Sequence, residues 1–496
     1  MTVFFLSLFF LAFRLFNLTG LPIFNDESIY LDWGWRETHL PKILYLSLFD
    51  SKPPLLMWIF GLSQNIFSDP LLAGRLVMIV FGLITALGIY FIAQGFFSQK
   101  AAVISFLIYT LSPIFAFFDR QALMESAISA IGVWSVYLII KVIEKKSLRL
   151  ALLLGIILGT GIFIKTNGLF FLIAIFLLVI VCFYKKRLPE CKYYLLSIVV
   201  SQLFLLPLYL QPQFWQTLAN NSRYSLTVNE ILSFPVKHWA NNVFNTGEII
   251  IWYFGPIYAV FFIVSIGLFL KKISSVKKII LFWFFFNLGL TILTARNIAP
   301  RYLVSFLPLS VLMISIIIAD IFKGKLWNFL WFTVIAIYPL LITVKLLTNP
   351  LAYFNLLSRQ TKFSQKYDYV EGWPSGYGIP ETVNYLKRKA GNQVIVVGVR
   401  GDHGNPESAI FAYFNNSKNI RPIFFEAKNI PNIESVNCIK TNLPVFFVSR
   451  DNNLGGFDKF LIKEDLFPKP AGKSYVGIYR INNNCIGKSI NINFQP

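Results

Sequence analysis

Cysteine and histidine are scarce in this chain, which has four cysteines and three histidines among its 496 residues. No Cys-x-x-Cys pair occurs, and no cysteines and histidines are spaced as ligands of one metal ion, so a structural zinc site has little support. Cys182 and Cys191 flank a basic loop. Cys438 and Cys485 lie in a polar C-terminal region and can form a disulfide if that region is outside the cytoplasm, with two ordinary thiols as the alternative.

Acidic residues are also few, at 24 Asp and Glu against 45 Lys and Arg, which gives a net charge of +21. A nucleic-acid-binding protein with this charge would need a contiguous basic surface. The basic residues are instead gathered in short loops between apolar runs, as in the cytoplasmic loops of membrane proteins. The sequence therefore predicts no nucleic-acid partner.

Long apolar runs dominate the first two thirds of the chain, and 56% of all residues are hydrophobic. Repeated runs of about 18 or more apolar residues indicate transmembrane helices. We predict a polytopic α-helical membrane protein with about eleven spans. They run approximately over Met1–Leu18, Leu71–Phe97, Ala101–Phe118, Ala122–Val142, Leu148–Ile164, Leu169–Tyr184, Tyr194–Leu210, Glu248–Leu270, Ile279–Thr294, Tyr302–Phe322 and Leu326–Leu347.

Two of these spans allow more than one interpretation. The first lacks a basic n-region and a small-residue cleavage site, which disfavours a removable signal peptide. The runs 148–164 and 169–184 are either two short helices, joined at Lys165-Thr166-Asn167-Gly168, or one re-entrant unit.

The orientation follows from the loops. With eleven spans, the loops rich in Lys and Arg all fall on one side, which the positive-inside rule makes cytoplasmic. The N-terminus is then cytoplasmic and the polar C-terminal region extracytoplasmic. The bias toward Ile, Lys, Asn and Phe indicates an AT-rich microbial genome, so we expect the plasma (inner) membrane of a prokaryote. The residues that set the orientation are Lys141, Lys145, Lys146, Arg149, Lys185, Lys186, Arg187, Lys271, Lys272, Lys277, Lys278, Lys323 and Lys325.

Two long loops fall on the outer side. The first, about Thr19 to Pro70, contains the apolar stretch Pro54–Phe67, which is too short to span and is expected to lie as a helix in the interface. The loop Gln211–Gly247 contains a similar stretch, Ser225–Trp239.

After Leu347 the composition becomes polar, and we predict two domains, residues 1–347 in the membrane and 348–496 as a soluble α/β domain. Strands are predicted at 394–399, 444–450 and 475–481, and a helix at Glu381–Ala390. The sequence Gly401-Asp402-His403-Gly404 after the first strand is either a ligand-binding loop or an ordinary turn, and the turn is favoured.

Acids and bases gather on the predicted outer side. A carboxylate can take a proton from an acceptor hydroxyl or amine, and Lys and Arg can neutralise a departing phosphate. Together they are typical of a transferase whose leaving group is a lipid-linked phosphate; plain structural pairing and a transport pathway are the alternatives. The residues are Asp26 and Glu27, Lys52, Arg120 with Glu125 nearby, and Arg301 with Tyr302.

The motifs FNDESIY (24–30) and DSKPPLLMW (50–58) resemble those of the bacterial dolichyl-phosphate-mannose–protein mannosyltransferase-like family. This is glycosyltransferase family 39 with its neighbours, and it includes relatives of the lipid A aminoarabinose transferase. The resemblance continues in DRQALMESA (119–127), ARNIAPRYLVSFLPL (295–309) and YVEGWPSGYGIPE (369–381). It covers the predicted spans and about forty residues after them.

The resemblance implies a GT-C fold, a polyprenyl- or dolichyl-phosphate-linked sugar donor, and inverting transfer at the outer face of the membrane. By motif, Asp26 would be the catalytic carboxylate and Glu27 its partner. Lys52 would contact the donor phosphate, with help from Arg120 and Arg301. Supporting roles fall to Glu125, where the family usually has Asp, to Lys165 and to Tyr302.

Each of these residues also has a structural interpretation. The acidic pair can cap a helix that starts near Ser28, and Lys52 can extend its ammonium to the interface. Arg120 can be an anchor paired with Asp119 or Glu125, and Arg301 an anchor at the end of a span.

Two other functions stay open. A lipid-linked sugar flippase or transporter would use midplane charges and internal repeats, but no repeat is evident and the charges lie at one face. A non-catalytic scaffold would bind a partner through its outer domain. No cofactor is predicted with certainty: a divalent cation stays undecided, because two adjacent acids make no convincing site without further ligands. The acceptor, whether protein, lipid or glycan, is not encoded in any recognisable motif.

Overall fold

The computed structural model describes residues 1–186, 188–271, 273–321, 324–482 and 488–494. The chain forms two compact units. The first consists of Met1–Leu18, Lys42–Ile59 and Arg75–Phe363, and the second of Thr19–Pro41, Phe60–Gly74 and Ser364–Pro496. Three of the basic residues that set the predicted orientation, Arg187, Lys272 and Lys323, lie outside the described residues.

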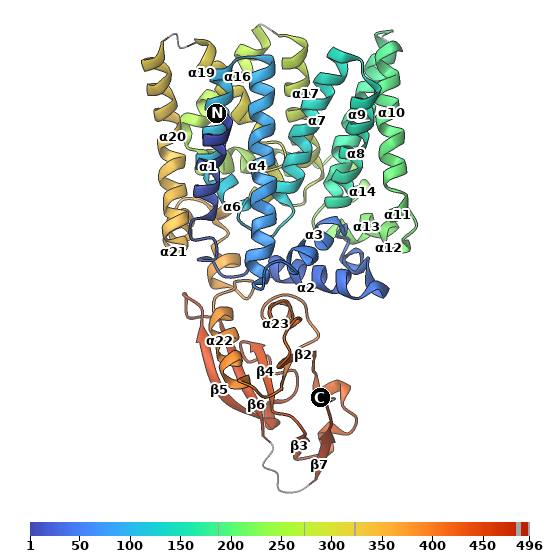
Figure 1. The fold of residues 1–496 in the computed structure, drawn as a ribbon, viewed down its shortest axis with the longest axis vertical. Coiled ribbons are helices and arrows are strands. Elements are labelled where there is room, and N and C mark those ends of the chain that lie inside the picture. The colour runs from blue at the N-terminus through green and yellow to red at the C-terminus, as the bar shows by residue number, and fades with distance from the viewer. Residues whose placement is uncertain (187, 272, 322–323, 483–487, 495–496) are drawn as a thin grey trace. The chain divides into compact units, whose positions relative to one another are not determined.

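The first unit is a bundle of apolar helices, most of which run along one another in Figure 1. α8 packs against α7 and α10, and α5 packs against α19. The longer helices are α1 (Thr2–Leu15), α4 (Pro70–Phe96, which begins in the second unit), α5 (Gln99–Leu111), α7 (Glu125–Lys145), α8 (Leu148–Ile164), α9 (Leu169–Tyr184), α10 (Leu188–Phe204), α15 (Val236–Phe254), α16 (Pro256–Lys271), α17 (Ser275–Thr294), α19 (Pro308–Ile321) and α20 (Lys325–Thr348). The shorter ones are α3 (Leu55–Ser63), α6 (Pro113–Phe118), α11 (Leu206–Tyr209), α12 (Pro212–Trp215), α13 (Thr217–Asn220), α14 (Val228–Leu232), α18 (Pro300–Leu303) and α21 (Pro350–Ser358).

Several of these helices are long and apolar enough to cross a membrane. Within the described residues four meet that condition by themselves, namely α4, α7, α17 and the Phe329–Thr348 part of α20. α15 and α16 add a fifth if they are one broken span, and five shorter apolar helices correspond to α1, α5, α8, α9 and α19. The chain is therefore a multi-pass membrane protein, and the number of eleven spans stays a prediction.

Four of the predicted spans are not single helices, and each break comes beside a proline. Pro113, Pro256 and Pro308 each open a new helix, and Pro207 is the second residue of α11. Proline lacks the N–H that would continue the preceding helix and disfavours helical geometry in the residue before it. The largest break separates α15 from α16, which are bent by 120° at Gly255. The hydrophobic pattern of the sequence predicts where these apolar segments lie, but it does not predict that they are broken into two helices.

Other predicted helices of the first unit are present with small changes. α8 and α9 have the predicted bounds and are separate helices joined by a 3₁₀ turn at Thr166–Gly168, which is the two-helix alternative. α3 lies within the predicted interfacial stretch 54–67. The stretch 225–239 instead holds α14 and the start of α15 with a break between them.

The second unit contains the predicted α/β structure. Its main sheet has the order β2-β1-β4-β6-β5, in which β2, β1 and β4 are parallel and β6 is antiparallel to both neighbours. The three predicted strands are β1, β4 and β6, and the predicted helix lies within α22. The elements are α2 (Asn25–His39), α22 (Ile379–Ala390), α23 (Glu407–Phe414), β1 (Ile395–Val399), β2 (Ile420–Phe424), β3 (Cys438–Thr441), β4 (Val445–Arg450), β5 (Leu461–Pro468), β6 (Tyr475–Ile481) and β7 (Ser489–Ile492).

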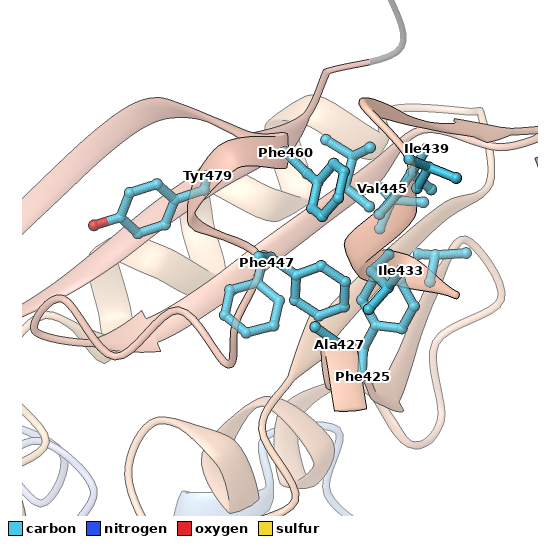
Figure 2. Close-up of a cluster of buried hydrophobic side chains, with 12 residues drawn as sticks. Phe425, Ala427, Ile433, Ile439, Val445, Phe447, Phe460 and Tyr479 are labelled. Atoms are coloured by element: carbon cyan, nitrogen blue, oxygen red, sulfur yellow. The ribbon is translucent and has the colours of Figure 1, made fainter. Parts of the chain in front are cut away.

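Aromatic side chains fill one core of this unit (Figure 2). The rings of Phe425 and Phe457 stack with centroids 4.5 Å apart, and Phe447 packs against Phe457 at 5.7 Å. Burying each such ring contributes roughly 1.5–3 kcal/mol. Cys438 lies in the small β3-β7 sheet and is disulfide-bonded, whereas Cys182 and Cys191 are buried and are not disulfide-bonded. Cys485, the predicted partner, lies outside the described residues.

Candidate active site

The acidic pair opens α2. The helix begins at Asn25, preceded by the extended residue Phe24, and Glu27 Oε2 accepts a hydrogen bond from the Phe24 N–H at 2.9 Å. This bond is half of a capping box, and a carboxylate at the start of a helix also suits the helix dipole. Glu27 is fully buried, while Asp26 is half-buried. Glu27 thus has the helix-capping role that the structural interpretation gave to the acidic pair. Asp26 keeps part of its surface exposed and is the acid of the pair that a ligand can reach.

A third carboxylate, Asp32, lies two turns further along α2. Its Oδ1 accepts from Arg36 Nε at 2.8 Å and from Asn415 Nδ2 at 3.0 Å. Burial raises the pKa of Asp32, and the guanidinium of Arg36 opposes that rise. Asp32 is 1% exposed and fastens α2 to the residue that follows α23.

The structure brings three of the predicted residues together in the first unit. Glu125 Oε1 accepts from Lys165 Nζ at 2.9 Å and from Arg301 Nε at 2.8 Å. They come from the first residue of α7, the end of α8 and the short helix α18, respectively. Glu125 is fully buried, while Lys165 and Arg301 keep 18% and 22% of their side chains exposed. One buried carboxylate thus holds two partly exposed cations side by side, and Lys and Arg are the side chains that bind phosphate groups in proteins.

Arg120 has a different environment from the predicted one. It is 7% exposed, and its guanidinium donates to the carbonyl oxygens of Arg14, Phe16 and Asn17 at 3.0, 2.8 and 2.7 Å. These are carbonyls at the end of α1, which otherwise have no partner within the helix. Arg120 is thus an anchor, although it pairs with α1 rather than with Asp119 or Glu125.

Arg14 is a residue that the sequence analysis missed. It is fully buried, and its Nε donates to Asp119 Oδ2 at 2.9 Å. Tyr109 and Ser126 donate to the other oxygen of Asp119 at 3.0 and 2.7 Å. An arginine inside an apolar run is costly unless it is paired. The presence of Arg14 in the first predicted span therefore indicated a buried ion pair.

Lys52 lies beside the second outer loop. Its Nζ is 5.2 Å from the centroid of the Tyr224 ring, and the guanidinium carbon of Arg223 is 5.1 Å from the same ring. Arg223 also pairs with Asp50. The Tyr224 carbonyl accepts from the N–H of Arg296 at 2.9 Å. Tyr224 therefore links the segment of Lys52 to the segment that leads into Arg301.

The second outer loop is fastened at a further point. Arg296 Nη2 donates to Glu230 Oε2 at 2.9 Å, and the N–H of Leu226 donates to the Thr294 carbonyl at 2.7 Å. Tyr302 follows Arg301 in α18. No pattern in the sequence pointed to Tyr224, because its role depends on a loop whose course hydrophobicity does not predict.

The predicted site residues are divided between the two units. Asp26 and Glu27 belong to the second, and Lys52, Arg120, Glu125, Lys165, Arg301 and Tyr302 to the first. In the described part of the chain, no three His, Cys, Asp or Glu side chains are grouped as ligands of a metal ion.

With this geometry in place, the chain was compared with known proteins. A family model described as dolichyl-phosphate-mannose-protein mannosyltransferase matches residues 51–210. The chain resembles these mannosyltransferases. The resemblance noted from the motifs is thereby confirmed. No curated protein sequence matches the chain.

The fold of this mannosyltransferase-like chain is similar to that of solved GT-C enzymes. ArnT from Cupriavidus metallidurans bound to undecaprenyl phosphate matches with a TM-score of 0.64 and 13% identity, over 96% of this chain and 97% of that one. The oligosaccharyltransferase of Archaeoglobus fulgidus, in complex with zinc and sulfate, matches with a TM-score of 0.54 and 13% identity, over 96% of this chain and 73% of that one. Its complex with an inhibitory peptide and a dolichol-phosphate gives a TM-score of 0.51, at the same identity and coverage. At such identities the likeness establishes the fold, and the predicted GT-C architecture is confirmed.

Proposed function

We propose that the chain is a membrane glycosyltransferase that moves a sugar from a polyprenyl-phosphate-linked donor to an acceptor, with inversion, at the outer face of a prokaryotic plasma membrane. The observation that carries the proposal is the group of Glu125, Lys165 and Arg301, in which one buried carboxylate holds two partly exposed cations together. The match to the mannosyltransferase family supports the sugar transfer. Two solved structures of similar fold hold undecaprenyl phosphate and a dolichol-phosphate, respectively, which supports the donor class.

In the proposed reaction the donor phosphate lies against Lys52, Lys165 and Arg301. The acceptor attacks the anomeric carbon from the side opposite the phosphate. A bond forms between the acceptor and that carbon as the bond from the carbon to the phosphate oxygen breaks. Asp26 orients the acceptor and takes its proton, and Glu27 holds the start of the helix that carries Asp26. The cations stabilise the negative charge that grows on the phosphate, and loss of one such group typically costs 10²–10³ in rate.

This proposal assigns different roles to the predicted phosphate ligands. Lys52 and Arg301 are retained, and Lys165 joins them because it shares the carboxylate of Glu125. We assign Arg120 to the end of α1, since three backbone carbonyls occupy its guanidinium. A divalent cation would assist at the same phosphate, and addition of EDTA to the purified protein tests for it.

The proposed orientation places the N-terminus in the cytoplasm, and the two proposed domains are residues 1–347 and 348–496. Lys145 and Arg149 lie at the end of α7 and the start of α8, whereas Glu125 and Lys165 lie at the opposite ends of these two helices. The positive-inside rule puts the first pair on the cytoplasmic side. The cations proposed to bind the donor are then on the outer side.

The test uses the purified protein in lipid nanodiscs with a panel of polyprenyl-phosphate sugars labelled in the sugar. We expect one of them to be consumed, with release of polyprenyl phosphate and transfer of the label to an acceptor from an envelope extract. A folded protein that consumes none of them would refute the proposal. The inverted configuration of the product, measured by NMR, tests the stereochemistry.

A further inference from the structure

The first residue of α2, Asn25, has a side-chain amide that is bonded at both ends. Its Oδ1 accepts a hydrogen bond from the backbone N–H of Asn405 at 3.1 Å, and its Nδ2 donates to Asp26 Oδ1 at 3.3 Å. Only the oxygen of a carboxamide can accept from an N–H. The Asn405 N–H therefore fixes the orientation of the Asn25 amide. The oxygen of the amide faces Asn405, and its NH₂ group faces the carboxylate of Asp26.

Asn405 also holds the chain that leads into α2. Its Nδ2 donates to the carbonyl oxygens of Ile23 at 3.0 Å and Pro374 at 2.9 Å. The Pro374 carbonyl accepts from the N–H of Asn25 as well, at 3.0 Å. Asn405 is 2% exposed, and a buried polar group that loses its partner is costly. A closed ring of hydrogen bonds thus joins the residues before α2, the loop at Pro374 and the loop after β1.

Two glycines allow these three backbones to approach so closely. A Cβ atom on Gly376 would lie 2.0 Å from the Ile23 carbonyl oxygen, and one on Gly404 would lie 1.9 Å from Asn25 Oδ1. Gly404 also has a φ of +113°, which side-chain-bearing residues rarely adopt. The Gly401–Gly404 sequence lies in the loop between β1 and α23, and its last glycine allows the close approach to the start of α2.

Lys469 anchors the Pro374 loop to the sheet. It follows the last residue of β5, is 3% exposed, and its Nζ donates to the carbonyl oxygens of Gly372, Trp373 and Ser375 at 2.8, 3.0 and 2.8 Å. An ammonium group has three donors, and all three are used here. The sheet thereby restrains the loop at Pro374, whose carbonyl oxygen accepts hydrogen bonds from both Asn25 and Asn405.

The far end of α2 is docked in the same unit. The guanidinium carbon of Arg36 lies 4.4 Å from the centroid of the Phe411 ring on α23, and Asn415 donates to Asp32. Both ends of α2 are therefore held by the residues around β1 and α23.

We infer that Asn405 is a positioning residue for the proposed transfer: through Asn25 it fixes the carboxylate of Asp26, and the soluble domain is the frame that holds helix α2. The inference rests on the proposed function for the role of Asp26, whereas the hydrogen-bond ring is independent of that function. On this inference the soluble domain helps to position the carboxylate of Asp26 for the reaction, instead of binding a separate partner.

The first test compares Asn405→Ala with a matched control, Asn419→Ala, in the full-length protein. Asn419 is a half-buried asparagine just before β2 whose Nδ2 donates to the Gly391 carbonyl at 3.0 Å. A displacement of about 1 Å at a reacting group can cost about 100-fold in rate. We expect Asn405→Ala to lower kcat by about 10- to 100-fold with the KM for the donor unchanged, because the proposed phosphate ligands are in the other unit. Unchanged kcat in Asn405→Ala, or an equal loss in the control, would overturn the inference.

The second variant is Asn25→Asp, which keeps an acceptor for the Asn405 N–H and replaces the NH₂ group beside Asp26 with a carboxylate oxygen. Two adjacent carboxylates raise the pKa of one of them. The acidic limb of the kcat–pH profile should therefore move to higher pH, a change that a purely structural role would not produce. An acidic limb that stays where it is in the wild type counts against the positioning role.

Hydrogen exchange separates this inference from the proposed function. Asn405→Ala should speed exchange of the amides of Asn25 and Ser28 at least about tenfold, while the amides of β1 and β4 exchange as in the wild type. If no donor is consumed by the wild type and this local change is still seen, the proposed function fails and the positioning of α2 stands. If the wild type transfers sugar and the α2 amides exchange equally in both proteins, the inference alone fails. Loss of protection throughout β1 and β4 also rejects it, since Asn405 would then support the whole sheet.

Discussion

Arg301 donates a hydrogen bond from Nε to Glu125 Oε1 at 2.8 Å, across 176 residues of sequence. The contact joins the first residue of α7 to the short helix α18, and Lys165 completes it from the end of α8. A fully buried carboxylate in this position stabilises two neighbouring cations and limits the directions in which they point. The first prediction concerns this pair.

Glu125→Gln should weaken both stability and turnover, because it removes the charge of the carboxylate that two partly buried cations share. Breaking a buried pair typically costs about 3–5 kcal/mol, and we expect a lower unfolding temperature together with a higher KM for the lipid-linked donor. Glu125→Asp keeps the charge, and resembles the family in this position, so it should retain more of both. Equal properties for the Gln variant and the wild type would show that the pair carries neither stability nor donor binding.

Lys52→Ala should fold normally and lose about 10²–10³ in turnover, as expected for removal of a cation from a departing phosphate. The measurement is single-turnover transfer from the donor that the panel identifies. Lys237→Ala is the matched control, because Lys237 is an exposed lysine in the first turn of α15. Normal turnover in purified Lys52→Ala would remove this residue from the phosphate site.

Asp26→Asn should reduce kcat by about 10²–10⁴, the usual contribution of a general base, without a change in expression. Asp69→Asn provides the comparison: Asp69 is an exposed residue whose Oδ1 accepts from the N–H of Leu72 at the start of α4. Activity retained in Asp26→Asn would identify another residue as the base.

Lys469 predicts a pH dependence of stability. Burial lowers its pKa to about 8, from 10.5 in the unfolded chain. Between these two values the unfolded state binds more protons, so the free energy of unfolding should rise with pH from about 8 to about 10.5. The rise should be missing in Lys469→Met and present in Lys463→Met, since Lys463 is an exposed lysine of β5, the strand that Lys469 follows. The measurement is denaturant unfolding of each protein at several pH values. A wild-type curve parallel to that of Lys469→Met would contradict the assignment.

The sequence predicted those features that depend on local pattern. The strands β1, β4 and β6, the helix α22 and the bounds of α8 and α9 follow from alternation, apolar runs and turn residues. Proline also explains the broken spans in retrospect, since Pro113, Pro256 and Pro308 each open a helix. Hydrophobicity by itself could not separate a broken span from a continuous one.

The candidate site was predictable in residue type but not in pairing. Isolated charges near span ends pointed to Glu125, Lys165 and Arg301, yet nothing local indicates that they share one carboxylate oxygen. The same holds for Arg120, whose partners are backbone carbonyls that carry no sequence signature. Asn405 was missed because its importance depends on residues 380 positions away.

The distance along the chain between Asn25 and Asn405 has a consequence for biogenesis. A ribosome that adds about 5–20 residues per second needs roughly 20–75 seconds to make the 380 residues that separate them. For that time the newly made α2 lacks the N–H that orients its first side chain. A nascent protein that stops short of the last quarter of the sequence would thus insert its helices but leave the carboxylate of Asp26 without the residue that positions it. The maturation of the enzyme is in this way coupled to the completion of its translation.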